Sequence, residues 1–353
     1  MPNSKQDKPL ATRLKDFFRG SKQSGFPQPS SYELKLDTEV LDDLSSDQPV
    51  QTRLRTLREL STQVREQRLQ QHSVEMLWYK VEDMLEPDQD KETRHTVLEF
   101  LTQLVLGQYD SLDMMRPVLF YFIKCHKVSE DFEKKVALLI ALTDNAKDIV
   151  HIEEQIGPLL LELLATRMEG EVMGDLLSCV SNMFKFNSAY LGQSVVARLI
   201  LLLSELSRLS SDSSGDREIL LCLEIFKCVI MYSFVPKDAV VPYISLLCRV
   251  VNLANIAAES WDTMRKLMGT HLGHSALYQL CNIVRSPKNK SDSALIRGAV
   301  LFLGQSVWGA QSIASLKYSP MIVLPVFCTA LENSHQLIII EVVMQIERWG
   351  PYV

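Results

Sequence analysis

Two histidines and one cysteine are the strongest candidates for metal chemistry in this sequence. His274 follows His271 by three residues, and Cys281 follows His274 by seven. On a continuous helix these spacings place all three side chains on one face, and imidazole and thiolate both bind zinc. However, Gly269 and Gly273 interrupt a helix there, and no fourth ligand lies nearby, whereas a structural zinc site needs four. Metal binding by this trio is therefore an alternative, and capping of a helix end by Thr270 or the histidines is favoured.

The rest of the sequence contains no motif for phosphate binding or nucleophilic catalysis. It has no glycine-rich phosphate loop of standard spacing, no Gly-x-Ser-x-Gly elbow and no His-Glu-x-x-His pair. Adjacent carboxylates such as Glu153 and Glu154 point in different directions on a helix, so they do not form a shared site. The sequence therefore predicts no catalytic residue, no metal site and no cofactor.

Composition and charge exclude several classes of protein. The chain has 353 residues, of which 46% are hydrophobic, and its net charge is -6. This length suits two domains or one body of repeats, and the acidic balance argues against a nucleic-acid partner.

The seven cysteines are scattered and include no Cys-x-x-Cys pair, which favours buried thiols in a reducing compartment. No apolar run approaches the ~20 residues of a membrane span, so we expect a cytoplasmic protein.

The first 35 residues differ from the rest. Because they are rich in proline, serine and lysine, we expect residues 1–35 to be a mostly disordered basic tail. Within the tail, apolar residues stand at helical spacing with basic residues between them: Leu10, Leu14, Phe17 and Phe18, with Arg13, Lys15 and Arg19. A short basic amphipathic helix of this kind can dock on a partner or on a membrane surface. The alternative is a weakly helical tail that touches nothing.

From about residue 37 the apolar pattern is helical throughout. Spacing with a period of 3.6 residues recurs over 50–70, 73–86, 91–107, 110–126, 130–144, 148–168, 171–186, 189–209, 216–233, 237–253, 256–268, 273–285, 292–314, 319–331 and 335–349. Alternate helices begin about 40 residues apart, the length of HEAT or armadillo units. No stretch alternates with period 2, so no sheet is expected. The sequence predicts an all-α fold, an α-solenoid of HEAT- or armadillo-like helix pairs over residues 36–353; globular helix packing is the alternative.

One internal loop is rich in serine. Between Ser207 and Asp216 the chain is short, polar and predicted to be exposed. Phosphorylation there would add charge and alter local contacts, and the candidate sites are Ser210, Ser211, Ser213 and Ser214. The alternative is a solvated loop between repeats.

Several collinear stretches add a resemblance to this picture. The stretch Leu267–Tyr278, followed by Leu295–Phe302 and Val307–Ala310, closely resembles the N-terminal region of the tuberin family, the large subunit of the tuberous sclerosis complex. Further similar stretches occur in the same order: His72–Trp78, Ala141–Asn145, Lys185–Ser188 and Tyr190–Leu191. The resemblance extends from about residue 8 to about residue 347.

The resemblance implies a HEAT-like solenoid that binds the coiled coil of hamartin. It also implies a role in activating GTP hydrolysis by the small GTPase Rheb, and so in restraining TOR signalling, in the cytoplasm and at the lysosomal surface. The family's GTPase-activating domain lies far beyond the equivalent of Val353, so we expect no activity from this chain and a solenoid that is incomplete at its C-terminal end. An end repeat without its neighbour exposes an apolar face, which we expect at Ile338–Ile346. A stand-alone helical-repeat adaptor without a GTPase link is the alternative.

Overall fold

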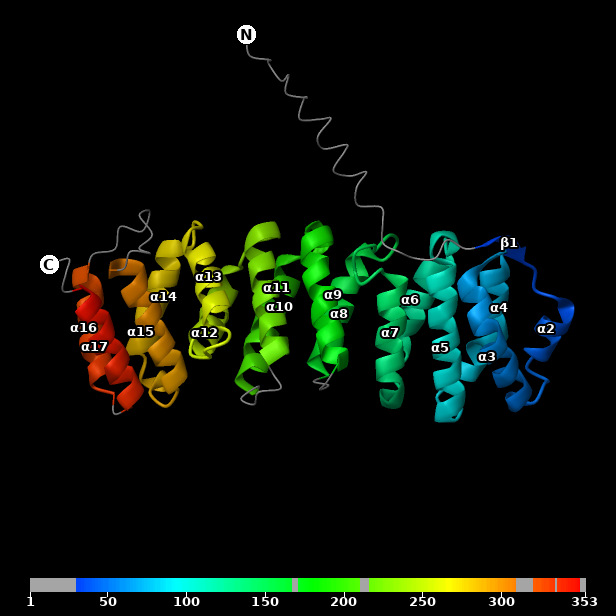
Figure 1. The fold of residues 1–353 in the computed structure, drawn as a ribbon, viewed down its shortest axis with the longest axis horizontal. Helices are drawn as coiled ribbons and strands as arrows, with labels where there is room; N and C mark the ends of the chain where they lie inside the picture. Colours follow the sequence, from blue (N-terminus) through cyan, green and yellow to red (C-terminus); the bar gives the residue numbers. More distant parts are fainter. Residues whose placement is uncertain (1–29, 167–170, 210–215, 309–319, 334, 350–353) are drawn as a thin grey trace, which may run out of the picture. The chain divides into compact units, whose positions relative to one another are not determined.

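The computed structural model describes residues 30–166, 171–209, 216–308, 320–333 and 335–349 (Figure 1). These residues are almost entirely helical, and they fall into two compact units, Met1–Met115 and Arg116–Val353. In the part of the chain that is described, no helix is both long enough and apolar enough to cross a membrane.

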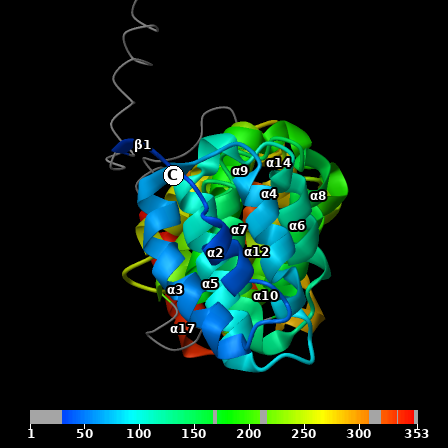
Figure 2. The same cartoon turned by 90° about the vertical axis from the view of Figure 1, so that its right-hand side faces the viewer.

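Unit 1 is built around two long helices that pack along each other. Its elements are, in chain order, β1 (Ser30–Leu34), α2 (Thr38–Asp43), α3 (Val50–Glu66), β2 (Gln67–Leu69), α4 (Ser73–Val81), η1 (Glu82–Leu85), α5 (Lys91–Gly107) and η2 (Tyr109–Ser111). The helices α3 and α5 form the most extensive contact, and α2, α3 and α4 face the viewer in Figure 2. The core between these helices contains fully buried side chains such as Leu57, Leu77 and Phe100.

A buried glutamine fixes the point at which α3 ends. The side-chain amide of Gln108 donates to the carbonyl oxygens of Val64 at 2.6 Å and Gln67 at 2.8 Å, and its oxygen accepts from the backbone N–H of Leu69 at 2.8 Å. The chain beyond Glu66 is therefore extended, and β2 pairs in parallel with β1. A helix through residue 70 and the absence of a sheet were predicted from the sequence. Both predictions were wrong at this place, because the tertiary contact overrides the local helical pattern.

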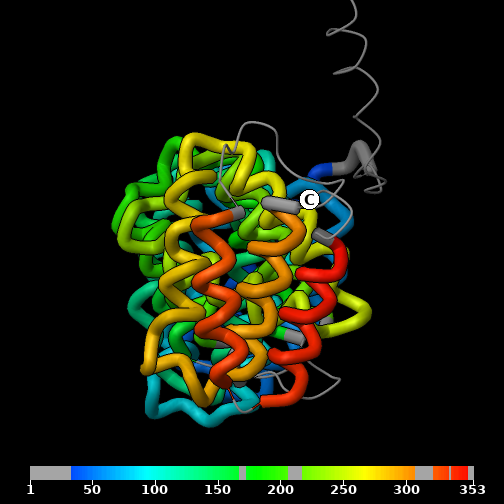
Figure 3. Tube along the Cα trace, turned by 90° about the vertical axis from the view of Figure 1, so that its left-hand side faces the viewer, coloured from blue at the N-terminus to red at the C-terminus, as the bar shows by residue number. Residues whose placement is uncertain are grey.

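Unit 2 continues the chain as a series of stacked helices. Its elements are α6 (Met115–Cys125), η3 (Ser129–Asp131), α7 (Phe132–Leu142), α8 (Glu153–Ala165), α9 (Glu171–Asn187), η4 (Ser188–Tyr190), α10 (Gln193–Leu209), α11 (Asp216–Tyr232), η6 (Lys237–Ala239), α12 (Val240–Val250), α13 (Ala257–Met268), α14 (Gly273–Arg285), η7 (Pro287–Asn289), α15 (Ser293–Trp308), α16 (Pro320–Leu331) and α17 (Gln336–Trp349). Figure 3 shows α15, α16 and α17 at the C-terminal end of this unit, where α16 contacts both α15 and α17.

The helices of unit 2 form two rows that pack against each other. In the first row α7, α9, α11 and α13 contact one another in turn, and in the second row α8, α10, α12, α15 and α17 do the same. Contacts from α8 to α9, from α10 to α11 and from α12 to α13 join the rows. This arrangement buries a continuous apolar core, as repeat proteins require. The predicted all-α solenoid of helix pairs is confirmed.

Ion pairs link successive helices within each row. In the first row Lys185 of α9 bonds to Glu224 of α11, and Lys227 of α11 bonds to Glu259 of α13. The hydrogen bond between the first two groups raises the pKa of Lys185 and lowers that of Glu224. In the second row Arg297 of α15 pairs with Glu341 of α17 at 3.3 Å. These contacts join neighbouring repeats. The two pairs of the first row are partly exposed and contribute little stability.

Candidate partner-binding surfaces

Two of the sequence-predicted sites lie outside the described residues. The first is the amphipathic stretch of the tail, and the second is the serine-rich loop. Nothing in the structure therefore places the following side chains: Leu10, Leu14, Phe17, Phe18, Ser210, Ser211, Ser213 and Ser214.

The histidine and cysteine candidates are described, and the structure does not bring them together. His271 lies in the turn before α14 and His274 is the second residue of that helix; both are exposed, whereas Cys281 is buried in the core. Among the described residues no group of three or more His, Cys, Asp or Glu side chains is arranged to hold a metal. The turn is closed by Thr270, whose hydroxyl donates to the carbonyl of Leu267 at 2.6 Å and accepts from the N–H of Leu272 at 3.2 Å.

The cysteines are predominantly buried. None of the seven forms a disulfide, and five are buried: Cys179, Cys222, Cys228, Cys248 and Cys281. Burial raises the pKa of Cys179 and of Cys222 to about 12, so these thiols are not nucleophiles. Cys125 and Cys328 are exposed, contrary to the general expectation of burial.

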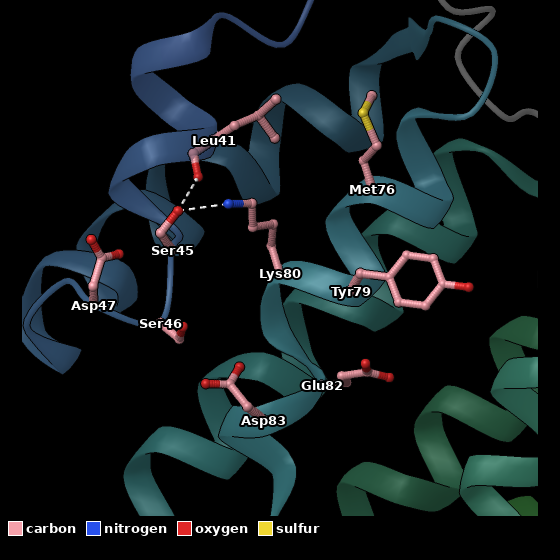
Figure 4. Close-up of a pocket in the computed structure, with 9 residues that line it drawn as sticks. All are labelled: Leu41, Ser45, Ser46, Asp47, Met76, Tyr79, Lys80, Glu82 and Asp83. Carbon is pink, nitrogen blue, oxygen red and sulfur yellow. Dashed lines mark hydrogen bonds between the residues drawn. The ribbon is translucent and has the colours of Figure 1, made fainter.

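Unit 1 contains a pocket of 610 Å³ between α2 and α4 (Figure 4). We call it the α2–α4 groove. It is lined by Leu41, Ser45, Ser46 and Asp47 from α2 and the chain after it, by Met76, Tyr79 and Lys80 from α4, and by Glu82 and Asp83 from η1. Two large apolar side chains are open to solvent there, since Tyr79 is 70% and Met76 41% exposed. The groove therefore combines accessible apolar area with carboxylates.

Hydrogen bonds inside the unit engage the groove's lysine and one of its aspartates. Lys80 Nζ donates to Ser45 Oγ at 2.6 Å, as Figure 4 shows. The guanidinium of Arg53, which is only 4% exposed, donates to both carboxylate oxygens of Asp83 and to the carbonyl of Lys80. The hydrogen bond from Arg53 holds the pKa of Asp83 below its ordinary value. The carboxylates that remain directed to solvent are those of Asp47 and Glu82, both on exposed residues.

The chain beside the groove is strongly acidic. Between Lys35 and Arg53 no basic residue occurs, whereas five acidic residues do: Asp37, Glu39, Asp42, Asp43 and Asp47. Asp37 precedes α2, three of the others lie within it and Asp47 follows it, and α2 forms one wall of the groove. The negative potential here therefore favours a basic ligand.

Unit 2 contains a left-handed turn between α7 and α8. Three consecutive residues other than glycine have positive φ: Asp144 at 44°, Asn145 at 56° and Ala146 at 60°. Asparagine side chains from α9 stabilise this conformation: Asn182 donates to the carbonyl of Asn145 at 3.0 Å, and Asn187 donates to the carbonyls of Ala146 and Lys147 at 2.9 Å each. The turn explains why α8 begins at Glu153, five residues later than the sequence pattern predicted.

Two exposed aromatic side chains flank Asn187. Phe186, at the end of α9, is 60% exposed, and Tyr190, in η4, is 52% exposed. Both lie in stretches that resemble the tuberin family. Neither residue was predicted from the sequence as a binding residue. The helical pattern does contain a signal, because Phe186 lies off the apolar face of α9. That face is formed by Leu176, Leu177, Val180, Met183 and Phe184.

The last two described helices expose a third apolar area. Met321 of α16 is 70% exposed, and on α17 Leu337, Ile340, Val343 and Met344 are exposed. The expected apolar face at Ile338–Ile346 is therefore present, although Ile338 and Val342 point into the core.

Comparison with known proteins agrees with this architecture. A family model, described as a domain of unknown function (DUF3384), matches residues 50–348. A structure of the TSC2 N-terminus is similar with a TM-score of 0.76 and 20% sequence identity, over 87% of this chain and 80% of that chain. A crystal structure of an engineered protein is similar with a TM-score of 0.45 and 13% identity, over 88% of this chain and 78% of that one, which is too low to support an argument.

The family model covers most of the chain, and the fold expected from the resemblance to the N-terminal region of tuberin, which is TSC2, is confirmed. The chain therefore belongs to the family described as domain of unknown function DUF3384, and its fold is that of the TSC2 N-terminus.

Proposed function

We propose that this chain is the partner-binding scaffold of a tuberin-like GTPase-activating protein and that its partner is the coiled coil of hamartin. The observation that supports this most is the likeness to the TSC2 N-terminus over 87% of the chain. The stretches that resemble the tuberin family add to it, because three of them contribute to the Asn187-stabilised turn and the exposed aromatic pair. No catalytic role is assigned to the chain.

The surface chemistry of unit 2 suits a helical partner. Phe186 and Tyr190 present apolar rings beside the charged residues Asp144 and Lys147, which are both exposed. A coiled-coil helix offers the complementary combination of apolar and charged side chains. Because the turn and α9 are cross-linked by hydrogen bonds, the aromatic pair is pre-organised, which lowers the entropic cost of binding.

In this proposal, activation of Rheb and restraint of TOR signalling belong to a different part of the full-length protein. The scaffold acts by positioning that part in the complex with hamartin. The complex works in the cytoplasm and associates peripherally with the lysosomal surface. A Rheb GTPase assay on the 353-residue chain should accordingly show no acceleration of hydrolysis.

Calorimetric titration of the purified chain with the hamartin coiled coil tests the proposal. We expect saturable binding with a dissociation constant in the micromolar range or tighter. This corresponds to a standard binding free energy of about -8 kcal/mol or a more negative value. A coiled coil of unrelated sequence and similar net charge is the control and should not bind. Absence of binding by hamartin, or equal binding by both coiled coils, would remove hamartin as the specific partner and leave a helical-repeat adaptor.

A further inference from the structure

The α2–α4 groove has the chemistry of a site for a short basic amphipathic helix, and the chain upstream of β1 contains a stretch with the sequence pattern of such a helix. We propose that the segment Leu10–Arg19 of the same chain binds in this groove. Its apolar side chains would cover Met76 and Tyr79, and its basic side chains would face the carboxylates beside α2. This inference does not depend on hamartin binding.

Charge complementarity is the first argument for this occupant. The segment before the first described residue, 1–29, contains six basic residues and two acidic ones. The opposing surface is acidic from Asp37 to Asp47 and at Glu82. The only lysine that lines the groove, Lys80, is directed to Ser45, and the buried Arg53 is paired with Asp83. Lys80 keeps its positive charge because serine is neutral, but the carboxylates from Asp37 to Asp47 and that of Glu82 outnumber it.

Size and shape are the second argument. A volume of 610 Å³ falls in the roughly 300–1,000 Å³ range of sites that enclose groups of a few side chains. In the tail, Leu10, Leu14 and Phe17 lie on one helical face at spacings of four and three residues. Such a face presents three apolar side chains in a line, which matches a groove bordered by one helix on each side.

The tether is the third argument. Ten residues lie between Arg19 and Ser30, where β1 begins, and at ~3.3 Å per step the eleven steps from Arg19 to Ser30 span at most about 36 Å. β1 pairs with β2, and β2 ends at Leu69, four residues before α4 begins at Ser73. Tyr79 is a further ~9 Å along the helix. The linker is therefore long enough, and so short a tether gives a millimolar effective concentration.

Hydrogen exchange of the full chain, followed by mass spectrometry, tests the proposal. A free helix of about ten residues is marginal in water, so slow exchange of the amides of residues 10–19 requires a surface that stabilises them. We expect exchange to be slowed at least about tenfold at low salt. Two groove variants, Asp47→Lys/Glu82→Lys and Tyr79→Ser, should each abolish the protection. The substituted positions are exposed, and an unchanged melting temperature verifies that the fold is retained.

The matched control is Glu133→Lys/Glu154→Lys, which makes the same charge change at two exposed residues of unit 2 and should keep the protection. Rapid exchange in the parent chain, or equal protection in the parent and either groove variant, would overturn the proposal. Protection that increases with protein concentration would also overturn it, because the occupant would then be a second copy. Protection that appears only with phosphatidylserine-containing vesicles would assign the segment to a membrane surface instead.

Discussion

The side-chain amide of Asn187 donates a hydrogen bond of 2.9 Å to the carbonyl oxygen of Ala146, forty-one residues earlier in the chain. Ala146 has a φ of 60° and is fully buried. A left-handed residue other than glycine costs roughly 1–2 kcal/mol, and here three occur in succession. The hydrogen bonds from α9 offset part of this cost, so the geometry of the turn depends on a helix that is formed later in the sequence.

Substitution of Asn187 by alanine should therefore destabilise unit 2. Two carbonyls, those of Ala146 and Lys147, lose their donor, and we expect a loss of about 2 kcal/mol in the free energy of unfolding. Urea denaturation monitored by circular dichroism measures it. The control is Asn282→Ala, which removes only a 3.5 Å contact within α14 and should cost less than about 0.5 kcal/mol. Equal losses in the two variants would show that the turn does not depend on Asn187.

Two helical glycines of unit 2 should respond oppositely to alanine. A Cβ at Gly298 of α15 would overlap the carbonyl oxygen of Cys248 on α12, so Gly298→Ala must separate the helices at a cost of about 2–3 kcal/mol. A Cβ at Gly174 of α9 would be at least 3.8 Å from Arg217 and Leu221. Gly174→Ala should instead stabilise by about 0.5–1 kcal/mol through helix propensity. Thermal unfolding of both variants tests this prediction. A change in melting temperature of the same sign in both would contradict the difference in packing around Gly298 and Gly174.

Local signals made part of the helix pattern predictable from sequence. The range 91–107 was predicted for α5 and is observed, since Asp90 accepts a hydrogen bond from the N–H of Thr93 at 3.0 Å and caps the helix as its residue type suggests. The bounds of α14 were likewise predicted as 273–285 and observed. In both cases a polar residue just before the helix forms the local hydrogen bonds at its start: Asp90 caps α5, and Thr270 closes the turn before α14.

Features that depend on distant residues were not predictable in this way. The end of α3 is set by Gln108, which lies 44 residues after Val64, the first residue whose carbonyl it binds. The left-handed turn depends on α9, and α2 is too short for a periodic pattern to be recognised. The α2–α4 groove depends on the position of α2 relative to α4, and no role for its carboxylates was predicted from the sequence.

Stability of unit 1 should depend on pH through the Arg53–Asp83 pair. The folded pKa of Asp83 lies below its ordinary value of 3.8 because Arg53 donates two hydrogen bonds to it. The pair's contribution is therefore fully present above pH 3.8 and is lost as the pH falls below that value toward the folded pKa. At pH 7, Asp83→Asn should cost about 2 kcal/mol, a modest figure because the carboxylate is partly exposed.

Urea unfolding of the parent chain and of Asp83→Asn between pH 7 and pH 3 measures this dependence. The difference between the two should be constant down to about pH 4 and should shrink below it. Glu92→Gln is the control: its pair with Arg58 is exposed on both sides and should contribute little at any pH. A constant difference down to pH 3 would mean that the carboxylate does not titrate with folding.

The aromatic pair of unit 2 should determine hamartin binding more than it determines folding. Phe186 and Tyr190 are exposed, so Phe186→Ser/Tyr190→Ser should leave the free energy of unfolding within about 0.5 kcal/mol of that of the parent. Large aromatic side chains dominate the energetics of interfaces, and loss of two should weaken hamartin binding by at least about tenfold. The control is Leu201→Ser on α10, which belongs to the other row and is 48% exposed. If Leu201→Ser weakened binding while the aromatic variant did not, the partner would lie along the second row instead.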